Sequence, residues 1–506
     1  INKYIKSIQD ELDELDPNDP KDQRKITSRE QKISNIEAGI FTTKKEKELV
    51  RPINLGSPID LPALMYGGEG FNMPIIKYTV DKKTNKPSNK PSTDEETLTE
   101  LRLKYKNPES PKAIFLDSLL ELRGLEKMYK TYILGWSEKV QDDDCLHGRY
   151  LIHGTDSGRL SSQEPNMQQI PKTSVDPNIK NQLVAKPGTL YLVCDFSQAE
   201  LRIMAHLSGD ETYLNAFNSG QDPHLAIAAK KYSVPYDEAY KIYDDDNHPD
   251  HGIWKVRRKQ AKQIAFGLIY GIGAKLLAVK LSDPKSGLIV TPEEAQQEMD
   301  TFFKQHPKLK TFKAKQERFL KKHGYLKSLF GRKRRLPQIY GDKQEQAYAI
   351  RLALNFPCQS AASDMTLFGS VLIYYMMRQG KLPMMQEVAT VHDAVYMNTD
   401  PKWINTWTVY TMWDIFHNPS TKPYFGFQIK DVTMDMDYTI GRTMAEELPF
   451  IPGYDYNKML QPDFSVEEYM EEHKKYKGIP ISDFPKLYSK EIKQYEKDFK
   501  KNPFKI

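Results

Sequence analysis

Short apolar runs in this chain lie next to two aspartates, among long stretches of helical spacing. The run LYLVC at 190–194 is typical of a buried strand, and Asp195 follows it directly. Two further apolar runs flank His392-Asp393, which places the second aspartate in the turn of a predicted hairpin. The pattern predicts a small sheet that carries both acids. The additional strands are predicted at 387–391, 394–397 and 427–438.

Most of the remaining chain has the apolar spacing of amphipathic helices. Two segments do not: 81–92 (DKKTNKPSNKPS) reads as an exposed basic loop, and 331–335 (GRKRR) reads as a dense cationic turn. The combination of many helices with a few strands predicts a helix-rich α+β fold. Helices are predicted at 1–15, 27–40, 110–132, 199–207, 254–281 with interruptions at Gly271 and Gly273, 291–323 and 343–380.

Composition sets only broad limits on the number of domains, the degree of order and the type of partner. At roughly 150 residues per domain, 506 residues predict about three domains, and a 39% hydrophobic content excludes wholesale disorder. The net charge of +5 permits binding to a polyanion without requiring it. Three cysteines are too few for a disulfide framework, and no run of about 18 apolar residues is present. We therefore expect a cytoplasmic protein.

The two aspartates have a structural and a chemical interpretation. An aspartate between a strand and a helix, as in Asp195-Phe196-Ser197, often caps the helix. If Asp195 and Asp393 instead meet in space, they can share divalent metal ions. A pair of such ions stabilises the attacking and leaving oxygens in phosphoryl transfer.

The segment 257–271 (RRKQAKQIAFGLIYG) is the most informative part of the sequence. Arg258, Lys262, Phe266 and Tyr270 recur every four residues and form one stripe along a helix. Cations followed by aromatics suit a ligand with a phosphate tail and a flat base. The alternative is an ordinary surface helix with snorkelling cations.

This segment resembles the fingers helix of the family A DNA polymerases, the bacterial DNA polymerase I class, possibly from a phage. Other motifs similar to that family follow in order over roughly 45–448. They are TDSGRLSSQEPNMQQIP at 155–171, DFSQAELRIMAHLS at 195–208, Asp222-Pro223-His224, GYLKSLFGRKRRLP at 324–337, NFPCQSAASD at 355–364 and Val391-His392-Asp393.

The resemblance implies a right-hand polymerase with an antiparallel-sheet palm, helical fingers and a helical thumb. It implies N-terminal helices and thumb at 1–135, palm at 136–208 and 351–448, and fingers at 209–350. Residues 449–506 would be an extension of unknown role, either a structural tail or a contact for DNA or replisome proteins. The segment before the thumb is too short for a proofreading exonuclease, so we expect no exonuclease activity in this chain.

The same resemblance assigns roles at the reaction centre. Asp195, Asp393 and the Phe196 carbonyl would hold two Mg²⁺ ions, with Mn²⁺ as a substitute, and Lys262 would act as a catalytic acid. The implied dNTP-binding residues are Arg258, Lys262, Phe266, Tyr270, His224, Glu200 and Gln198. The implied primer–template residues are Arg159, Asn166, Gln168, Asn355, Gln359, His392 and Arg351.

The sequence departs from the family pattern in its second catalytic motif. The family usually has His-Asp-Glu, and here Ala394 follows Asp393. Two alternatives to a DNA polymerase therefore remain. One is a single-subunit RNA polymerase, against which Glu200 and Phe266 argue, and the other is a DNA-binding scaffold with a decayed site, for which Ala394 is the only support. Phe266 in place of Tyr predicts discrimination against dideoxynucleotides.

Overall fold

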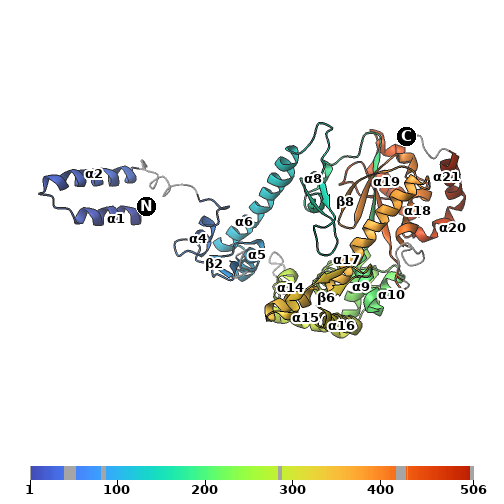
Figure 1. Cartoon of the computed structure of the whole chain (residues 1–506), viewed down its shortest axis with the longest axis horizontal. Helices are drawn as coiled ribbons and strands as arrows, with labels where there is room; N and C mark the ends of the chain where they lie inside the picture. Colours follow the sequence, from blue (N-terminus) through green and yellow to red (C-terminus); the bar gives the residue numbers. More distant parts are fainter. Residues whose placement is uncertain are drawn as a thin grey trace. The chain divides into compact units, whose positions relative to one another are not determined.

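The computed structural model describes residues 2–38, 53–80, 87–282, 288–417, 429 and 431–501. The chain divides into two compact units, Ile1–Leu120 and Glu121–Ile506 (Figure 1). Each unit has a core of its own, and the sheet with both aspartates belongs entirely to the second. The α+β class predicted from the sequence is confirmed.

The first unit begins with two polar helices, α1 (Asn2–Asp13) and α2 (Pro20–Glu37). Asp19 caps α2 by accepting a hydrogen bond from the Lys21 amide, and Pro20 occupies the first turn. This start signal places the beginning of α2 well before the predicted 27–40. Arg29 of α2 forms a 3.0 Å ion pair with Glu11 of α1, which joins the two helices.

The remainder of the first unit packs around a small apolar core. Arg102 of α5 donates to both carboxylate oxygens of Asp117 at 2.9 Å. The predicted loop at 81–92 is wrong in part, because Pro87–Pro91 pairs with Tyr78–Val80 as a strand, while 81–86 lie outside the described residues. The elements are α4 (Asp60–Tyr66), β1 (Tyr78–Val80), β2 (Pro87–Pro91), α5 (Glu95–Lys104) and α6 (Pro111–Lys127), and the core residues are Leu61, Met65, Met73, Leu98, Leu101, Leu116 and Leu119.

A five-stranded antiparallel sheet organises the second unit, in the order β11-β10-β5-β9-β8. The predicted buried strand and hairpin are confirmed, whereas the strand predicted at 427–438 is formed at Met436–Gly441 instead. Central β5 pairs with β9 on one side and β10 on the other. The strands are β5 (Leu190–Phe196), β8 (Gln386–Val391), β9 (Ala394–Thr399), β10 (Met436–Gly441) and β11 (Leu448–Pro449).

The two faces of this sheet differ because successive side chains of a strand point to opposite sides. Leu190, Leu192 and Cys194 of β5 enter the main core of the unit, and each is 0% exposed. Tyr191 and Val193 face a smaller core, and Asp195 follows them at the period of two. The acid is thus placed on the face away from the main core.

A helical module follows β5 in the chain and leads to α17, a 36-residue helix (Figure 1). Figure 1 shows α17 running from α15 and α16 toward the sheet and α18. The predicted interruption of 254–281 is confirmed between α13 and α14. The helices are α9 (Ala199–Ser208), α10 (Glu211–Asn218), α11 (Pro223–Lys231), α12 (Tyr236–Asp244), α13 (His251–Ile269), α14 (Ala274–Leu281), α15 (Pro292–Gln305), α16 (Pro307–His323), α17 (Lys343–Arg378) and α18 (Thr406–His417).

Shorter elements connect these parts. The predicted cationic turn at 331–335 is confirmed only for Gly331 and Arg332, because Lys333–Arg335 forms strand β7 against β6. The predicted helix at 110–132 ends at Lys127 and continues as a π-helical segment. The connecting elements are η1 (Met128–Leu134), α7 (Gly135–Ser137), β3 (Arg149–Leu151), β4 (Ser161–Gln163), η2 (Met167–Gln169), α8 (Pro177–Asn181), β6 (Tyr325–Lys327), β7 (Lys333–Arg335), η3 (Pro337–Tyr340) and η4 (Pro401–Trp403).

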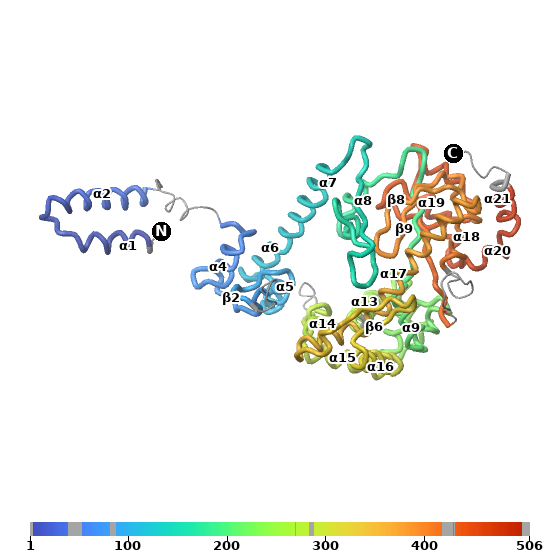
Figure 2. Tube along the Cα trace, viewed as in Figure 1, coloured from blue at the N-terminus to red at the C-terminus, as the bar shows by residue number. Residues whose placement is uncertain are grey.

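The C-terminal residues 449–501 contribute several buried side chains to the core of the second unit. Tyr456, Tyr469 and Phe484 are at most 3% exposed and join the same apolar cluster as β5. Figure 2 shows the last helices beside α18, and Thr406 of α18 donates to Glu491 at 2.5 Å. These elements are η5 (Tyr456–Leu460), α19 (Val466–His473), η6 (Lys474–Tyr476), η7 (Ile481–Asp483), α20 (Phe484–Leu487) and α21 (Ser489–Lys501).

Candidate functional site

The sheet brings the two predicted aspartates to one end of neighbouring strands. Asp195 pairs in register with Ala394, the residue that follows Asp393. His392 holds the left-handed conformation, φ 57°, that closes the two-residue turn of the hairpin. The strand and the hairpin turn therefore present Asp195 and Asp393 from adjacent backbones.

The acids at this end of the sheet repel one another. Burial raises the pKa of Asp195 to about 7, and Asp393, Asp437 and Glu447 raise it further by their negative charges. On the other side of β5, Asp437 of β10 pairs in register with Asp195. A carboxylate with this pKa is poorly compensated by the protein alone.

Sequence reasoning missed Asp437. Asp435 and Asp437 alternate with Met434 and Met436, which marks one polar face of a strand. That alternation predicts the shared face of the two acids but not the register. Only the pairing of β10 with β5 shows that Asp437, rather than Asp435, lies opposite Asp195.

The donors at this position fit a divalent cation. Asp393 Oδ1 is buried without a hydrogen bond, and its ion-pair partner is the Arg159 guanidinium at 3.6 Å, which leaves this oxygen incompletely compensated. Carboxylate oxygens are the ligands that Mg²⁺ prefers. The side chain of Ala394 offers no ligand atom for a metal ion. The side chain of Phe196 packs edge-on against Phe416, on the opposite face of the sheet from Asp195.

Glu200 lies at the centre of a hydrogen-bonded group beside these acids. The side chain is 5% exposed, accepts from Arg159 at 2.5 Å and accepts from the Tyr270 hydroxyl at 2.9 Å. The same Arg159 nitrogen lies 3.6 Å from Asp393 Oδ1. Arg159 therefore links the predicted metal-binding residues to Glu200 and, through it, to the end of α13.

The stripe on α13 faces this group. The rings of Phe266 and Tyr270 stack with centroids 6.1 Å apart, and the His224 ring lies 5.6 Å from Phe266. Lys262 Nζ lies 5.9 Å from the Phe266 centroid. Gly271 ends the stripe with φ 67°, and a Cβ there would lie 2.5 Å from the Arg351 carbonyl oxygen, so only glycine fits.

At the other end of the stripe, Arg258 forms a 2.6 Å ion pair with Asp222. Asp222 also caps α11, where its Oδ1 accepts from the Leu225 amide at 2.7 Å. His224 is 2% exposed, and burial lowers its pKa to about 4, so the ring is neutral near pH 7. Cations and a neutral imidazole thus converge on one side of α13.

The predicted primer–template residues divide into two groups. Gln168 accepts from the His392 amide at 2.9 Å and also donates to the Thr390 carbonyl, which fixes the hairpin against η2. Asn166 caps η2 by accepting from the Gln168 amide. Asn355, Gln359 and Arg351 all lie on α17, where Asn355 is buried and Arg351 is exposed.

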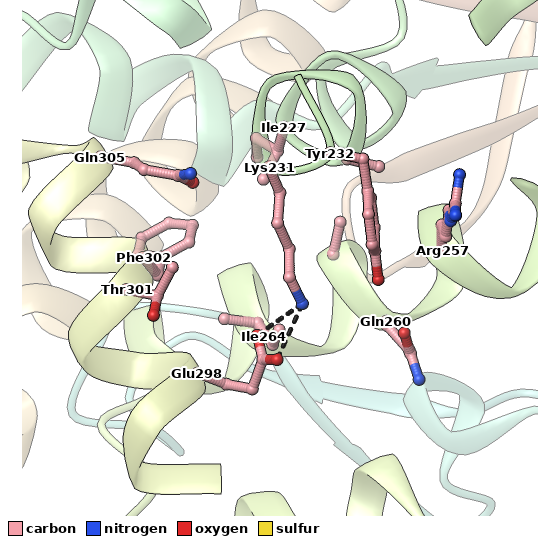
Figure 3. A pocket seen from close by; sticks show the side chains of 12 residues that line it. Ile227, Lys231, Tyr232, Arg257, Gln260, Ile264, Glu298, Thr301, Phe302 and Gln305 are labelled. Carbon is pink, nitrogen blue, oxygen red and sulfur yellow. Dashed lines mark hydrogen bonds and ion pairs between the residues drawn. The ribbon is translucent and has the colours of Figure 1, made fainter. Parts of the chain in front are cut away.

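The opposite face of α13 borders a pocket with both polar and apolar side chains, which Figure 3 shows. Arg257, Gln260 and Ile264 line a pocket that α11 and α15 close. Lys231 of α11 forms a 2.7 Å ion pair with Glu298 of α15 across this pocket (Figure 3). The ion pair joins the two helices that support α13 from behind.

A second group of potential metal ligands has a simpler explanation. Ligand atoms of Asp143, Cys145 and His147 lie within 4.8 Å of one another on an exposed loop. A 2.9 Å hydrogen bond between Asp143 and His147 accounts for their closeness. None of the described helices is long and apolar enough to cross a bilayer.

Comparison with known proteins identifies related sequences and a related fold. The model of DNA polymerase family A matches residues 22–445. The thermostable DNA polymerase I of Thermus aquaticus is 30% identical over 370 residues, covering 72% of this chain and 39% of that protein. DNA polymerase I of Mycobacterium tuberculosis H37Rv is 30% identical over 354 residues, covering 69% of this chain and 35% of the relative.

A solved structure agrees with this match. It is described as the POL domain of Pol1 from M. smegmatis in complex with DNA primer-template and dNTP, and it superposes with a TM-score of 0.62 at 26% identity. The superposition covers 88% of this chain and 66% of the solved chain. The chain spans well under half the length of the curated relatives it matches.

Proposed function

This chain belongs to DNA polymerase family A, and we propose that it extends the 3′ end of a primer by template-directed addition of dNTPs, with release of pyrophosphate. The observation that carries the proposal is the convergence of the two aspartates with the stripe of α13. Arg159 and Glu200 connect these parts through contacts of 2.5, 2.9 and 3.6 Å. An acid pair next to a cationic and aromatic surface suits a nucleoside triphosphate.

We further propose that Asp195, Asp393 and the Phe196 carbonyl hold two Mg²⁺ ions, with Mn²⁺ able to substitute. When bound, the ions supply charge stabilisation for the attacking and leaving oxygens. Asp393 Oδ1, which accepts no hydrogen bond and has Arg159 at 3.6 Å, and the raised pKa of Asp195 support this assignment, because a metal ion would compensate both carboxylates. Ala394 then leaves the site with one fewer carboxylate than the usual motif of the family.

The residues of the stripe have distinct proposed tasks. Arg258 and Lys262 bind the triphosphate, and Lys262 also donates a proton to the departing pyrophosphate. Phe266 packs on the incoming sugar and base, and Tyr270 occupies the template position until a nucleotide enters. His224 and Gln198 approach the phosphates from α11 and from the start of α9.

Glu200 is proposed to select deoxyribose. Its carboxylate is buried and is held by Arg159, so it cannot move aside for a 2′-hydroxyl when Tyr270 leaves on nucleotide entry. Arg159, Gln168 and His392 are proposed to contact the primer–template minor groove, where the hydrogen-bond acceptors are nearly alike for all base pairs. Asn166, Asn355, Gln359 and Arg351 complete that proposed set.

In this proposal the N-terminal helices and thumb are 1–135, the palm is 136–208 with 351–448, and the fingers are 209–350. The compact unit that contains the proposed thumb core ends at Leu120. The burial of Tyr456, Tyr469 and Phe484 favours a structural role for 449–506 over a contact with DNA or replisome proteins. The proposed site of action is the cytoplasm, the host's if a phage encodes the chain.

Primer extension with Mg²⁺ tests this function. We expect the chain to extend a primed DNA template with dNTPs and not with NTPs. Preferential use of NTPs would favour a single-subunit RNA polymerase, and primer–template binding without extension would favour a decayed scaffold. The raised pKa of Asp195 and the intact Arg258 and Lys262 favour an active site over a decayed one.

The identity of Phe266 gives a more selective test. We expect dideoxynucleotides to be poor substrates, and we expect Phe266→Tyr to improve their incorporation while ordinary dNTP incorporation changes little. Single-nucleotide incorporation rates with ddNTP and dNTP measure this ratio. An unchanged ratio in the variant would remove the proposed contact between Phe266 and the incoming sugar.

A further inference from the structure

We propose that Asp222 weakens the binding of phosphate tails and favours the release of pyrophosphate, because it occupies Arg258 whenever no ligand phosphate does. The inference rests on the proposed polymerase function and deepens it. The carboxylate of Asp222 is a built-in competitor at the position where a phosphate would bind. Only a ligand that interacts with Arg258 more strongly than this carboxylate gains that contact.

The geometry fixes Asp222 firmly in place. Its Oδ1 accepts from the Leu225 amide at 2.7 Å and caps α11, while its own amide donates to the Tyr236 hydroxyl at 2.9 Å. Its Oδ2 remains for Arg258, at 2.6 Å. One oxygen therefore serves the helix and the other serves the cation, so the competitor stays in position when Arg258 leaves.

Arg258 is held at fewer points than a guanidinium allows. One terminal nitrogen binds Asp222, the guanidinium lies 5.5 Å from the Tyr243 ring, and Nε is buried with no hydrogen-bond partner. A guanidinium prefers two parallel hydrogen bonds, which a phosphate can supply. The side chains of Arg258 and Asp222 are 28% and 22% exposed, so a ligand can reach the pair from solvent.

The surroundings of the pair offer a ligand phosphate a second cation. Lys262 lies one turn further along α13, and His224, two residues after Asp222, is neutral near pH 7. An open cleft lies beside Asp222, and its lining also includes Gln198, Arg202 and Asp435. Within the described residues the ion pair of Arg258 is made with Asp222, so replacing this acid frees that cation without exposing a second one.

The exchange has consequences for binding and for release. A phosphate tail that binds Arg258 must first displace this carboxylate, so Asp222 lowers the affinity for dNTP at least as much as the affinity for dNDP. After the reaction, Asp222 can recover Arg258 from pyrophosphate and so weaken product binding. Asp222 thus reduces the affinity for phosphate ligands without improving the discrimination between them.

Asp222→Asn tests this inference, because Asn is an equally good N-cap and removes only the charge. A dideoxy-terminated primer–template prevents chemistry, and the dNTP needed to form the stable ternary complex is measured at equilibrium. We expect about three- to tenfold tighter dNTP binding, a gain for dNDP no larger than the gain for dNTP, and stronger inhibition of extension by pyrophosphate. Thermal unfolding of the variant checks that α11 remains capped.

Asp342→Asn is the matched control. Asp342 is an exposed N-cap of α17 that accepts from the Gln344 and Glu345 amides, and the same change there should leave dNTP and dNDP binding unaltered. Unchanged or weaker dNTP binding in Asp222→Asn, with normal unfolding, would overturn the inference. The proposed function fails separately, if the wild-type chain forms no ternary complex and extends no primer.

Discussion

The two faces of the five-stranded sheet use the same strands for opposite purposes. On one face Leu190, Leu192 and Cys194 are 0% exposed and pack in the main core. On the other face Asp195 pairs with Asp437 and Ala394, and burial together with the nearby acids raises the pKa of Asp195 to about 7. Successive residues of β5, Cys194 and Asp195, therefore point to opposite faces, one into apolar packing and the other toward repelling carboxylates.

This difference shows why the acids can be tolerated. Because the apolar face supplies the stability, the polar face can keep carboxylates in a mutually repulsive arrangement that a cation would relieve. Substitutions on one face should affect stability and leave the chemistry intact, and substitutions on the other should do the reverse. The following predictions test how complete this separation is.

The largest effect is expected from Asp195→Ala. Loss of a metal-binding carboxylate should slow primer extension by about a thousandfold or more, equivalent to about 4 kcal/mol. The free energy of unfolding should not fall, because the change removes a source of repulsion. Rapid-quench extension and urea unfolding measure the two quantities, and primer–template binding should persist as the control. An unaltered extension rate would refute the metal assignment.

Leu192→Ala should have the opposite effect on the same strand. Leu192 is 0% exposed, and its truncation should lower the free energy of unfolding by about 3 kcal/mol through lost burial and a cavity. The extension rate per folded molecule should stay within about twofold at a temperature where the variant is folded. A large loss of rate without loss of stability would show that the two faces are coupled.

Ala394→Glu should sharpen the comparison by restoring a carboxylate beside Asp195. We expect the Mg²⁺ concentration for half-maximal extension to fall about threefold, since Mg²⁺ affinity rises with carboxylate charge. Ala394→Gln has similar size without the charge and serves as the control. Equal behaviour of the two variants would show that position 394 does not act on the metal through its charge.

Asp437→Asn is expected to have the smallest effect. Burial raises the pKa of Asp437, and the charge of Asp435 adds to this, so its ionised form destabilises the fold. The variant should gain about 0.5 kcal/mol at pH 8, a value reduced by solvent screening. The gain should disappear as the pH falls below the ordinary pKa of aspartate, where both states are protonated. Urea unfolding at several pH values in chelator measures it.

The sequence predicts the local elements of the site better than its long-range contacts. Strand β5, the hairpin of β8 and β9, and the break between α13 and α14 follow from apolar runs, turn residues and glycine. The ion pair of Arg258 with Asp222 and the hydrogen bonds of Glu200 with Arg159 and Tyr270 join elements far apart in the chain. No local pattern encodes which partner each side chain meets.

The misplaced strand shows why such predictions fail. Val432, Met434 and Met436 alternate with polar residues and are all at most 4% exposed, so the pattern correctly reports burial from 432 onward. Ladder pairing with β5 begins only at Met436. Alternation records which side chains are buried, whereas pairing depends on a neighbouring strand that lies elsewhere in the sequence.

The central position of β5 has a consequence for how the protein is made. β5 is complete at Phe196, but its neighbours β9 and β10 begin at Ala394 and Met436. At synthesis rates of about 5–20 residues per second, an emerging β5 waits about 10–40 s for its first partner. An apolar strand with two open edges is prone to wrong pairing during that time. The same order means that a nascent chain cannot assemble its acidic pair until most of it has been translated.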